Sequence, residues 1–390
     1  MLRCPVCSTS DAFPLVAVAR MPLIGCLFAE SESDAADAEC GTLDIVVCPE
    51  CGHIYNRAFD SERIKYVAGY DNALGFSPHH RAQSKAKAKH LIHTHGLRHK
   101  VIVDIGCGNG DFLSRLCAEG VNVGVGYDPS QESRAFRAGE GFVEVRSKRF
   151  ETADHGPVDF VCSQHVLEHL EDLQRMLRSV RGILKHGGTG YFEVPNGRTI
   201  FRDRHIWDLT YEHVSYFTPQ SLHRALSDAG FSILEIGSSF GGQYLDAEVL
   251  ANDGAATRPP VSNDNLDVYK TFPDAFTSIM GQWNNRMTAL LAEGRRVVLW
   301  GAGTKAVSFL NMLGIRVDKV KYVVDVNPRK SGRFVPGMAQ MIVPPDHLRQ
   351  YRPDVTIAMN AEYLHEIQAT LESMSLHCDL LAVTGAPSEG

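Results

Sequence analysis

The sequence lacks an excess of positive charge and lacks any long apolar run. Its 39 Lys and Arg residues stand against 46 Asp and Glu residues, which gives a formal net charge of −7. Because binding to a phosphate backbone needs clustered Lys and Arg, this balance argues against a general nucleic-acid binder. No apolar run approaches the roughly 18–20 residues of a membrane span, and "MLRCPVCSTS" has no signal-peptide core. We therefore expect a cytoplasmic protein that binds neither nucleic acid nor membrane.

Solenoid-length repeats and low-complexity tracts are also absent, so the domain organisation must be read from the hydrophobic pattern. At 390 residues the chain is too long for one ordinary core. From 100 to about 245, short apolar runs such as "KVIVDIG" and "NVGVGYD" alternate with amphipathic stretches. This alternation is typical of a mostly parallel sheet with helices on both faces. A second alternation begins at "RRVVLWGAG", after a polar stretch at 251–265 that predicts a linker.

Ten cysteines are many for an intracellular chain, but four of them form two C-x-x-C knuckles, Cys4 with Cys7 and Cys48 with Cys51. Each knuckle turns two thiolates toward one point, and two knuckles complete the tetrahedron that zinc prefers. With no ligand position left open, the predicted Zn²⁺ has a structural role. The alternative is a set of four buried or redox thiols.

These patterns together predict an α/β fold in four parts. Residues 1–60 are expected to form a zinc-binding domain, and residues 61–250 a Rossmann-like domain with leading helices. Residues 251–294 are expected to form a linker and a helix, and residues 295–390 a second, C-terminal Rossmann-like domain.

The first of two glycine-rich loops, "VDIGCGNGDF", follows an apolar strand that ends in Asp104. Gly106 and Gly108 let the backbone approach a ligand closely. Aspartate stands at 111, where a dinucleotide fingerprint needs a small residue, so the loop fits a ligand with a cationic amino-acid end. Asp128 ends the next strand, where a carboxylate accepts hydrogen bonds from ribose hydroxyls. S-adenosylmethionine meets these demands.

Two further strand ends extend this prediction. Phe150 and Glu151 follow the third strand and are candidates to flank the adenine. Ser163, Gln164 and His165 stand at the carboxyl end of the fourth strand, where ligands of open α/β sheets bind. The alternatives are a glycine-rich turn that binds nothing, or a nicotinamide enzyme.

The second loop, "VVLWGAGTKAVSFL", matches the dinucleotide pattern G-x-G-x-x-A through Gly301, Gly303 and Ala306. Asp325 ends the strand that follows. This loop predicts a site for a phosphorylated ligand, and the alternative is a tight strand-to-helix turn without a ligand.

With these motifs in order, the sequence resembles the three-part sugar C-methyltransferases of deoxysugar biosynthesis. The likeness rests on the two knuckles, "VDIGCGNG", "HVLEHL" and the run that begins "GAGTKAVSFLNMLG". It implies a zinc-binding domain, a class I methyltransferase domain that uses S-adenosylmethionine, and a C-terminal Rossmann-like domain. It also implies a small-molecule substrate, a nucleotide-linked 4-keto deoxyhexose that is methylated on the carbon beside the ketone. The implied substrate-binding residues of the C-terminal domain are Gly301, Gly303, Lys305 and Asp325.

The resemblance also implies the catalytic residues. The family's Tyr-His-Glu-His run stands here as Thr210-Tyr211-Glu212-His213, so the glutamate and the final histidine match. We expect His213 to be the general base, with Glu212 and Tyr211 beside it; the alternative is a histidine that caps local backbone groups. The family's His-Gly-Gly-Ser run reads "FGGQ" here, which keeps Gly241 and Gly242 as substrate-binding candidates while Phe240 and Gln243 depart from the pattern.

The predicted function is therefore S-adenosylmethionine-dependent C-methylation of a nucleotide-linked keto deoxysugar. Two alternatives stay open at this point. One is an O-methyltransferase acting on a sugar or natural-product hydroxyl, and the other is a non-catalytic protein that binds S-adenosylmethionine.

Overall fold

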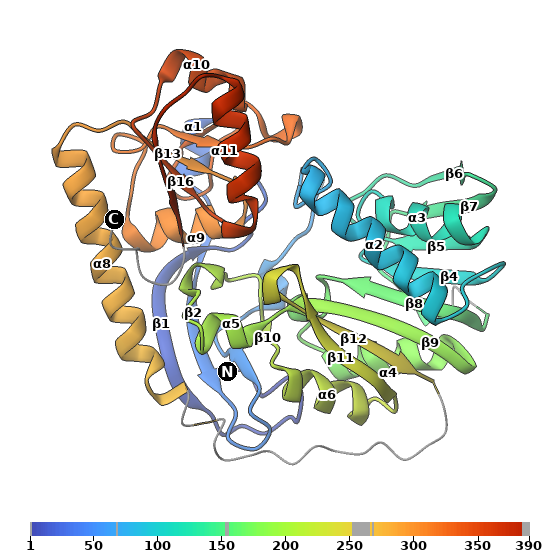
Figure 1. The fold of residues 1–390 in the computed structure, drawn as a ribbon. Helices are drawn as coiled ribbons and strands as arrows, with labels where there is room; N and C mark the ends of the chain where they lie inside the picture. The colour runs from blue at the N-terminus through green and yellow to red at the C-terminus, as the bar shows by residue number, and fades with distance from the viewer. Residues whose placement is uncertain (1, 68, 153–155, 252–265, 267–268, 384–390) are drawn as a thin grey trace.

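The computed structural model describes residues 2–67, 69–152, 156–251, 266 and 269–383 (Figure 1). They form three sheets of four, eight and five strands. The linker predicted at 251–265 lies, apart from Ala251, outside these residues. Among the described helices, none is long and apolar enough to cross a membrane.

The four-stranded sheet is built mostly from the N-terminal segment. Its first three strands are antiparallel, and a short strand from much later in the chain, β10, completes it by pairing with β3. In that pairing Ser215 lies opposite Tyr55, and Tyr216 lies opposite Ile54. The elements are β1 (Phe13–Pro22), α1 (Glu32–Ala36), β2 (Cys40–Val47), β3 (Ile54–Asn56) and β10 (Ser215–Tyr216).

The eight-stranded sheet has the order β11-β12-β9-β8-β4-β5-β7-β6. Five central strands are parallel, and their buried runs carry the apolar residues that the sequence pattern indicated. The strands are β4 (Val101–Ile105), β5 (Val123–Tyr127), β6 (Arg134–Ala138), β7 (Gly141–Arg146), β8 (Val158–Gln164), β9 (Leu184–Pro195), β11 (Ser232–Ser239) and β12 (Tyr244–Leu250).

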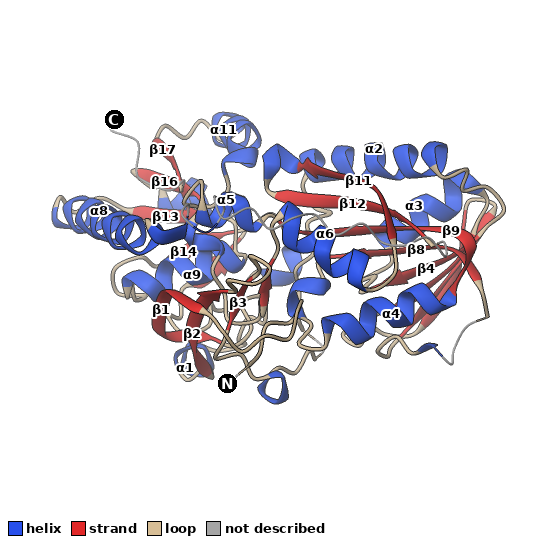
Figure 2. Ribbon diagram, turned by 90° about the horizontal axis from the view of Figure 1, so that it is seen from below, coloured by secondary structure: helices blue, strands red, loops and turns tan. Residues whose placement is uncertain are grey.

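Helices cover both faces of this sheet, with α2 and α3 on one side and α4 and α6 on the other (Figure 2). Helix α6 shows how the sequence sets such an element: Thr218 and Ser221 form a capping box, and a proline opens the first turn. Its apolar face then packs against the sheet. The helices are α2 (Pro78–Thr94), α3 (Asp111–Gly120), α4 (Leu173–Ile183), α5 (Gly197–Phe201) and α6 (Pro219–Asp228).

One element departs from the predicted alternation of strands and helices. The stretch between β5 and β7 forms strand β6, which pairs antiparallel with β7 at the sheet edge. Ala138 lies opposite Gly141, so only Gly139 and Glu140 connect the two strands. Gly139 has φ +59°, the left-handed conformation that a two-residue hairpin turn requires. A hairpin therefore takes the place of a helix.

The five-stranded sheet is wholly parallel, with the order β15-β14-β13-β16-β17. Its core is continuous with that of the N-terminal sheet, and Trp207, Trp283 and Phe309 meet edge to face inside it. The elements are α8 (Phe272–Ala292), β13 (Val297–Trp300), α9 (Thr304–Leu313), β14 (Tyr322–Val324), β15 (Met341–Val343), α10 (Leu348–Tyr351), β16 (Val355–Ala358), α11 (Leu364–Ser373) and β17 (Asp379–Ala382). The predicted α/β class with two Rossmann-like sheets is confirmed.

Candidate active site

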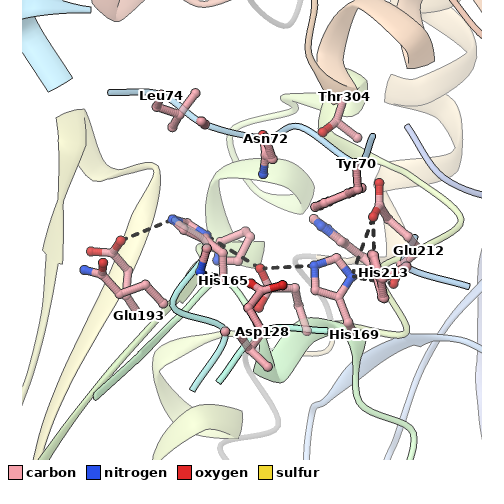
Figure 3. Close-up of a pocket in the computed structure, with 18 of the residues that line it drawn as sticks. Tyr70, Asn72, Leu74, Asp128, His165, His169, Glu193, Glu212, His213 and Thr304 are labelled. Carbon is pink, nitrogen blue, oxygen red and sulfur yellow. Dashed lines mark hydrogen bonds and ion pairs between the residues drawn. The ribbon is translucent and has the colours of Figure 1, made fainter. Parts of the chain in front are cut away.

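A cavity of about 1900 Å³ lies between the eight-stranded and five-stranded sheets. Both glycine-rich loops line it, because the carboxyl ends of β4 and β13 face it from opposite sides. Residues 61–67 and 69–77, between the N-terminal sheet and α2, supply a further wall through Tyr66, Tyr70 and Asn72. Figure 3 shows Tyr70 and Asn72 in this wall. The two loops that the sequence singled out therefore open into one space.

The first loop has the backbone that its glycines predict. Gly106 and Gly108 have φ of +75° and +52°, and a Cβ at Gly106 would lie 2.1 Å from Cγ2 of Val166. At Gly108 a Cβ would meet no described atom within 4 Å, so this backbone faces open space. The Gly108 amide donates to Oδ2 of Asp128 at 2.9 Å, which ties the loop to the end of β5. The positive φ of Gly106 and the contact with Val166 together exclude every residue other than glycine at this position.

Most of the other predicted donor-site residues also line the cavity: Asp128, Phe150, Glu151, Gln164 and His165. Asp104 and Ser163 instead lie beneath the loop. The Ser163 hydroxyl donates to the carbonyl of Ile105 at 3.0 Å and so ties β8 to β4. Burial raises the pKa of Asp104 to about 7. These two residues support the loop from below and lie outside the cavity lining.

An acid at the end of the next strand, β14, also accepts a hydrogen bond from the second loop. Asp325 accepts the Ala302 amide at 2.8 Å through Oδ2 and the Asn327 amide at 2.8 Å through Oδ1. The buried Lys330 ammonium lies 3.3 Å from Oδ2 of the same carboxylate. Gly301 has φ +108°, and Gly303 caps α9 without a side-chain hydrogen bond, so the first amides of α9 lack a side-chain cap.

The glycine pair expected to bind substrate lies beside the cavity and does not line it. A Cβ at Gly241 would lie 2.1 Å from Oε1 of Glu362, so Gly241 allows the β11–β12 connection to approach the turn after β16 closely, whereas a Cβ at Gly242 would meet no described atom within 4 Å. Its neighbours Phe240 and Gln243, where the sequence departs from the family pattern, do line the cavity.

Gln243 joins the two sheets across the cavity wall. Its amide exchanges hydrogen bonds of 2.9 and 3.0 Å with the amide of Asn360, and Oε1 also accepts from Nζ of Lys305 at 3.0 Å. Lys305 is paired in addition with Asp208 at 3.1 Å. Sequence reasoning missed the Gln243–Asn360 contact, since the two residues are far apart in the chain.

A row of alternating carboxylates and imidazoles crosses the cavity. His165 presents Nε2 to Glu193 at 3.1 Å and Nδ1 to Glu168 at 3.5 Å. The same oxygen of Glu168 lies 3.9 Å from Nε2 of His169, whose Nδ1 lies 3.9 Å from Oε2 of Glu212. Figure 3 shows His165 and His169 between Glu193 and Glu212. His165 has φ +56°, an unusual conformation for a side chain of this size.

Glu212 is directed toward His169 and the N-terminal segment. Its Oε1 accepts the Gly25 amide at 2.9 Å, and its Oε2 accepts the Tyr66 hydroxyl at 3.3 Å. The Nδ1 of His169 lies 2.9 Å from the Glu212 carbonyl, which can only accept, so that nitrogen carries the proton. Burial raises the pKa of Glu212. None of these contacts is with His213, so the carboxylate adjacent in sequence does not orient that imidazole.

His213 lines the cavity and meets the His169 ring edge to face at 4.9 Å between centroids. Its Nδ1 is buried and has no hydrogen-bond partner among the described residues. Burial lowers the pKa of His213 to about 3, and the charge of His169 adds to this effect. The imidazole is therefore neutral at neutral pH and has a lone pair to accept a proton.

Tyr211 lies away from the cavity. It is 1% exposed, and its hydroxyl accepts from the Asp60 amide at 3.2 Å and donates to the Ala58 carbonyl at 3.3 Å. Its ring packs against Gly41, where a Cβ would lie 2.2 Å from the ring. Tyr66, which contacts both His169 and Glu212, occupies the place beside the imidazoles that was expected for Tyr211.

The four knuckle cysteines come together as predicted. Sγ of Cys4 lies 3.6 Å from that of Cys51, and Sγ of Cys7 lies 3.5 Å from that of Cys48. All four sulfur atoms lie within 4.8 Å of one another, and the thiols are free. Zn–S bonds of about 2.3 Å in a tetrahedron place sulfur atoms roughly 3.8 Å apart, so the cluster fits that ion.

Two protein families match parts of this chain. Residues 78–236 match a methyltransferase domain family, and residues 260–377 match the C-methyltransferase C-terminal domain family. The C-methyltransferase NovU of Streptomyces niveus is 24% identical over 94% of this chain and 91% of its own length. A ubiquinone biosynthesis O-methyltransferase of Erwinia tasmaniensis is 28% identical over 38% of this chain and 63% of its own length.

Among solved structures, the 1,6-didemethyltoxoflavin-N1-methyltransferase of Burkholderia thailandensis is 15% identical and aligns with 45% of this chain and 84% of its own, with a TM-score of 0.35. The domain matches make the chain an S-adenosylmethionine-dependent methyltransferase. The C-terminal domain match and the likeness to NovU support a C-methyltransferase family in particular.

Proposed function

We propose that this enzyme methylates a carbon atom of a nucleotide-linked keto deoxysugar and uses His213 as the general base. The observation that carries the proposal is the single cavity that contains both glycine-rich loops, with histidines between them. Its volume of about 1900 Å³ exceeds the roughly 300–1,000 Å³ typical of a one-ligand pocket. There is room for a methyl donor and a nucleotide-sized acceptor together.

S-adenosylmethionine fits the first loop. The open space over Gly108 and the carboxylate of Asp128 at the cavity edge suit a ribose and an amino-acid end. Phe150 and Glu151 are the proposed neighbours of the adenine. When bound, this cofactor supplies an electrophilic methyl group.

The acceptor's nucleotide is proposed to lie at the second loop. The first amides of α9, next to Gly301 and Gly303, are placed to donate to phosphate oxygens. Asp325 holds this loop through the Ala302 amide, and Lys305 presents its ammonium at the cavity wall. Such an arrangement places the sugar toward the imidazoles, between the two loops.

The chemistry of the proposed step assigns one task to each group. The carbon beside a ketone is acidic, so a neutral imidazole can remove its proton and leave an enolate. His213 is neutral and lines the cavity, so its lone pair can accept this proton. Burial lowers its pKa and weakens it as a base, so a nearby negative charge is needed to offset this loss. The cavity walls are proposed to hold the enolate near the methyl donor and to limit the access of water.

We also propose that Cys4, Cys7, Cys48 and Cys51 hold one structural Zn²⁺, and that the domain boundaries are 1–60, 61–250, 251–294 and 295–390. The sulfur distances and the free thiols support the zinc site. A cytoplasmic location belongs to the same proposal, since a reducing compartment keeps such thiolates available.

A mass-spectrometric screen tests the function. Nucleotide-linked keto sugars are incubated with enzyme and donor, and the product is expected to gain the mass of one methylene. Proton NMR of the product separates a new C-methyl from an O-methyl group, so an O-methylated product would instead identify the alternative enzyme. Replacement of His213 by Asn should lower turnover about 10²–10⁴-fold and leave donor binding unchanged. Near-normal turnover would make His213 structural.

A further inference from the structure

Glu168 is the most unusually placed acid of the cavity. It follows β8 in the run "HVLEHL" and is 1% exposed. Neither carboxylate oxygen accepts a short, well-aligned hydrogen bond from a described residue, and the best candidate donor is Nδ1 of His165 at 3.5 Å. The nearest titratable groups are imidazoles, with ring nitrogens at 3.5 Å on His165 and 3.9 Å on His169. A carboxylate so deprived of hydrogen bonds is costly to keep unless nearby groups use its charge.

The surroundings keep Glu168 ionised. Burial by itself raises the pKa of a carboxyl group, but the neighbouring His165 and His169 outweigh it and hold the pKa of Glu168 below its usual value. A ring nitrogen of His213 also lies within 4.8 Å of the carboxylate. Three imidazoles from two segments of the chain therefore surround one buried negative charge.

From this geometry we propose that Glu168 is the positioning residue for the base His213. Its buried carboxylate holds the surrounding imidazoles in place and stabilises the imidazolium that forms when His213 takes a proton. The inference rests on the proposed function, because it assigns a partner to the base of that reaction. The role parallels that of the buried carboxylate in hydrolase triads, which stabilises a transient imidazolium without taking the proton itself.

Glu212, the acid next to His213 in sequence, does not supply this charge directly. Its two oxygens are engaged by the Gly25 amide and the Tyr66 hydroxyl. Glu168 can supply the charge, because no short hydrogen bond from a described residue engages its oxygens. Its negative charge raises the pKa of His213 and so opposes the lowering that burial causes.

The step affected is the proton transfer alone. The C–H bond beside the acceptor ketone breaks, the electron pair stays with the acceptor as an enolate, and the proton moves to a ring nitrogen of His213. A neutral imidazole thereby becomes a cation in a buried site. Without an adjacent negative charge this cation is disfavoured by desolvation, so the barrier to proton removal rises.

The experiment follows that step without methyl transfer. The full-length enzyme is incubated in D₂O with S-adenosylhomocysteine and the keto sugar nucleotide that the mass-spectrometric screen identifies. Exchange of the acidic hydrogen is measured by proton NMR. Three variants are compared with the wild type: Glu168→Gln removes the charge, Glu168→Asp keeps it, and Glu119→Gln is a matched control at an exposed acid of α3 outside the cavity lining.

Glu168→Gln is expected to slow exchange and kcat about 10- to 100-fold, with the acceptor KM and the affinity for S-adenosylhomocysteine nearly unchanged. Glu168→Asp should recover part of the rate, and Glu119→Gln should match the wild type. Melting temperature and donor affinity show whether each variant is folded. Equal exchange rates for wild type and Glu168→Gln would overturn the assignment.

Two further outcomes separate the competing explanations. If the wild type neither exchanges nor methylates any keto sugar nucleotide, the proposed function itself fails, and Glu168 loses its role with it. Elemental analysis addresses a metal site, since a carboxylate oxygen of Glu168 and ring nitrogens of His169 and His213 lie within 4.8 Å of one another. A second metal ion per chain, beyond that of the four cysteines, that Glu168→Gln and His213→Asn both remove would overturn the proposal.

Discussion

Replacement of Asp128 by Asn should weaken binding of the methyl donor, by an amount that follows from the hydrogen bonds of this carboxylate. A carboxylate offers about four lone-pair sites. Oδ1 accepts the Ser130 amide at 2.9 Å and the Ser130 hydroxyl at 2.6 Å, and Oδ2 accepts the Gly108 amide at 2.9 Å. One site is left for a ribose hydroxyl in this arrangement. Loss of one charge-assisted hydrogen bond costs about 1.5–3 kcal/mol, which raises Kd about 10- to 140-fold.

Calorimetric titration with S-adenosylhomocysteine measures this change directly. Asparagine has nearly the shape of aspartate and keeps both Ser130 hydrogen bonds when its oxygen takes the Oδ1 position. Its NH2 group then faces the Gly108 amide and the ribose, so both of those hydrogen bonds are lost, and the melting temperature measures the cost to the loop. Glu140→Gln serves as the control, because Glu140 is exposed in the β6–β7 turn. Unchanged donor affinity in Asp128→Asn would refute the assignment of this carboxylate to the ribose.

Further predictions follow from other contacts. Cys48→Ser should leave less than one zinc per chain by elemental analysis and lower the melting temperature, because metal binding contributes to folding. The depressed pKa of His213, about 3 against roughly 6.5 in the unfolded chain, means that the unfolded state binds more protons between these values. Its contribution to stability is therefore present above pH 6.5 and lost as pH falls, by about 2–3 kcal/mol at pH 4.5, and His213→Asn should show a flatter dependence of melting temperature on pH. Gly41→Ala should destabilise the fold by about 1–3 kcal/mol, since the new Cβ meets the Tyr211 ring at 2.2 Å; an unchanged melting temperature would count against this packing. Gln243→Ala should raise the acceptor KM in steady-state kinetics, with no change in donor affinity by calorimetry.

The fold was largely readable from the sequence because buried parallel strands leave continuous apolar runs. The apolar runs of β4, β5 and β8 do not show the helical spacing of apolar residues, so they indicate strands, and glycines mark the end of β4. The β6 segment was not recognised as a strand. Its sequence "RAFRA" has one large apolar residue, Phe136, between two arginines, and the turn at Gly139 and the partner strand β7 make it extended.

The site was readable only in part. Strand-end reasoning brought Asp128, Gln164 and His165 to one cavity, because carboxyl ends of parallel strands meet at one edge. The direction of Glu212 depends on the Gly25 amide, 187 residues earlier in the chain, and no local pattern encodes such a contact. The surroundings of Glu168 likewise depend on imidazoles from two segments of the chain. The motif "HVLEHL" contains this residue but does not indicate that it is buried among them.

Strand β10 has a consequence for how the chain is made. The first three strands of the N-terminal sheet leave the ribosome early, but their fourth strand, Ser215–Tyr216, is synthesised only after most of the donor domain. Domains generally fold in order of synthesis, yet this sheet stays one strand short until that point. The cysteine-bearing segment must therefore wait for a strand that starts two residues after His213. Deletion of residues 1–60 would leave β10 without its partner strand β3, so the N-terminal sheet and the loop that carries His213 are one unit of assembly.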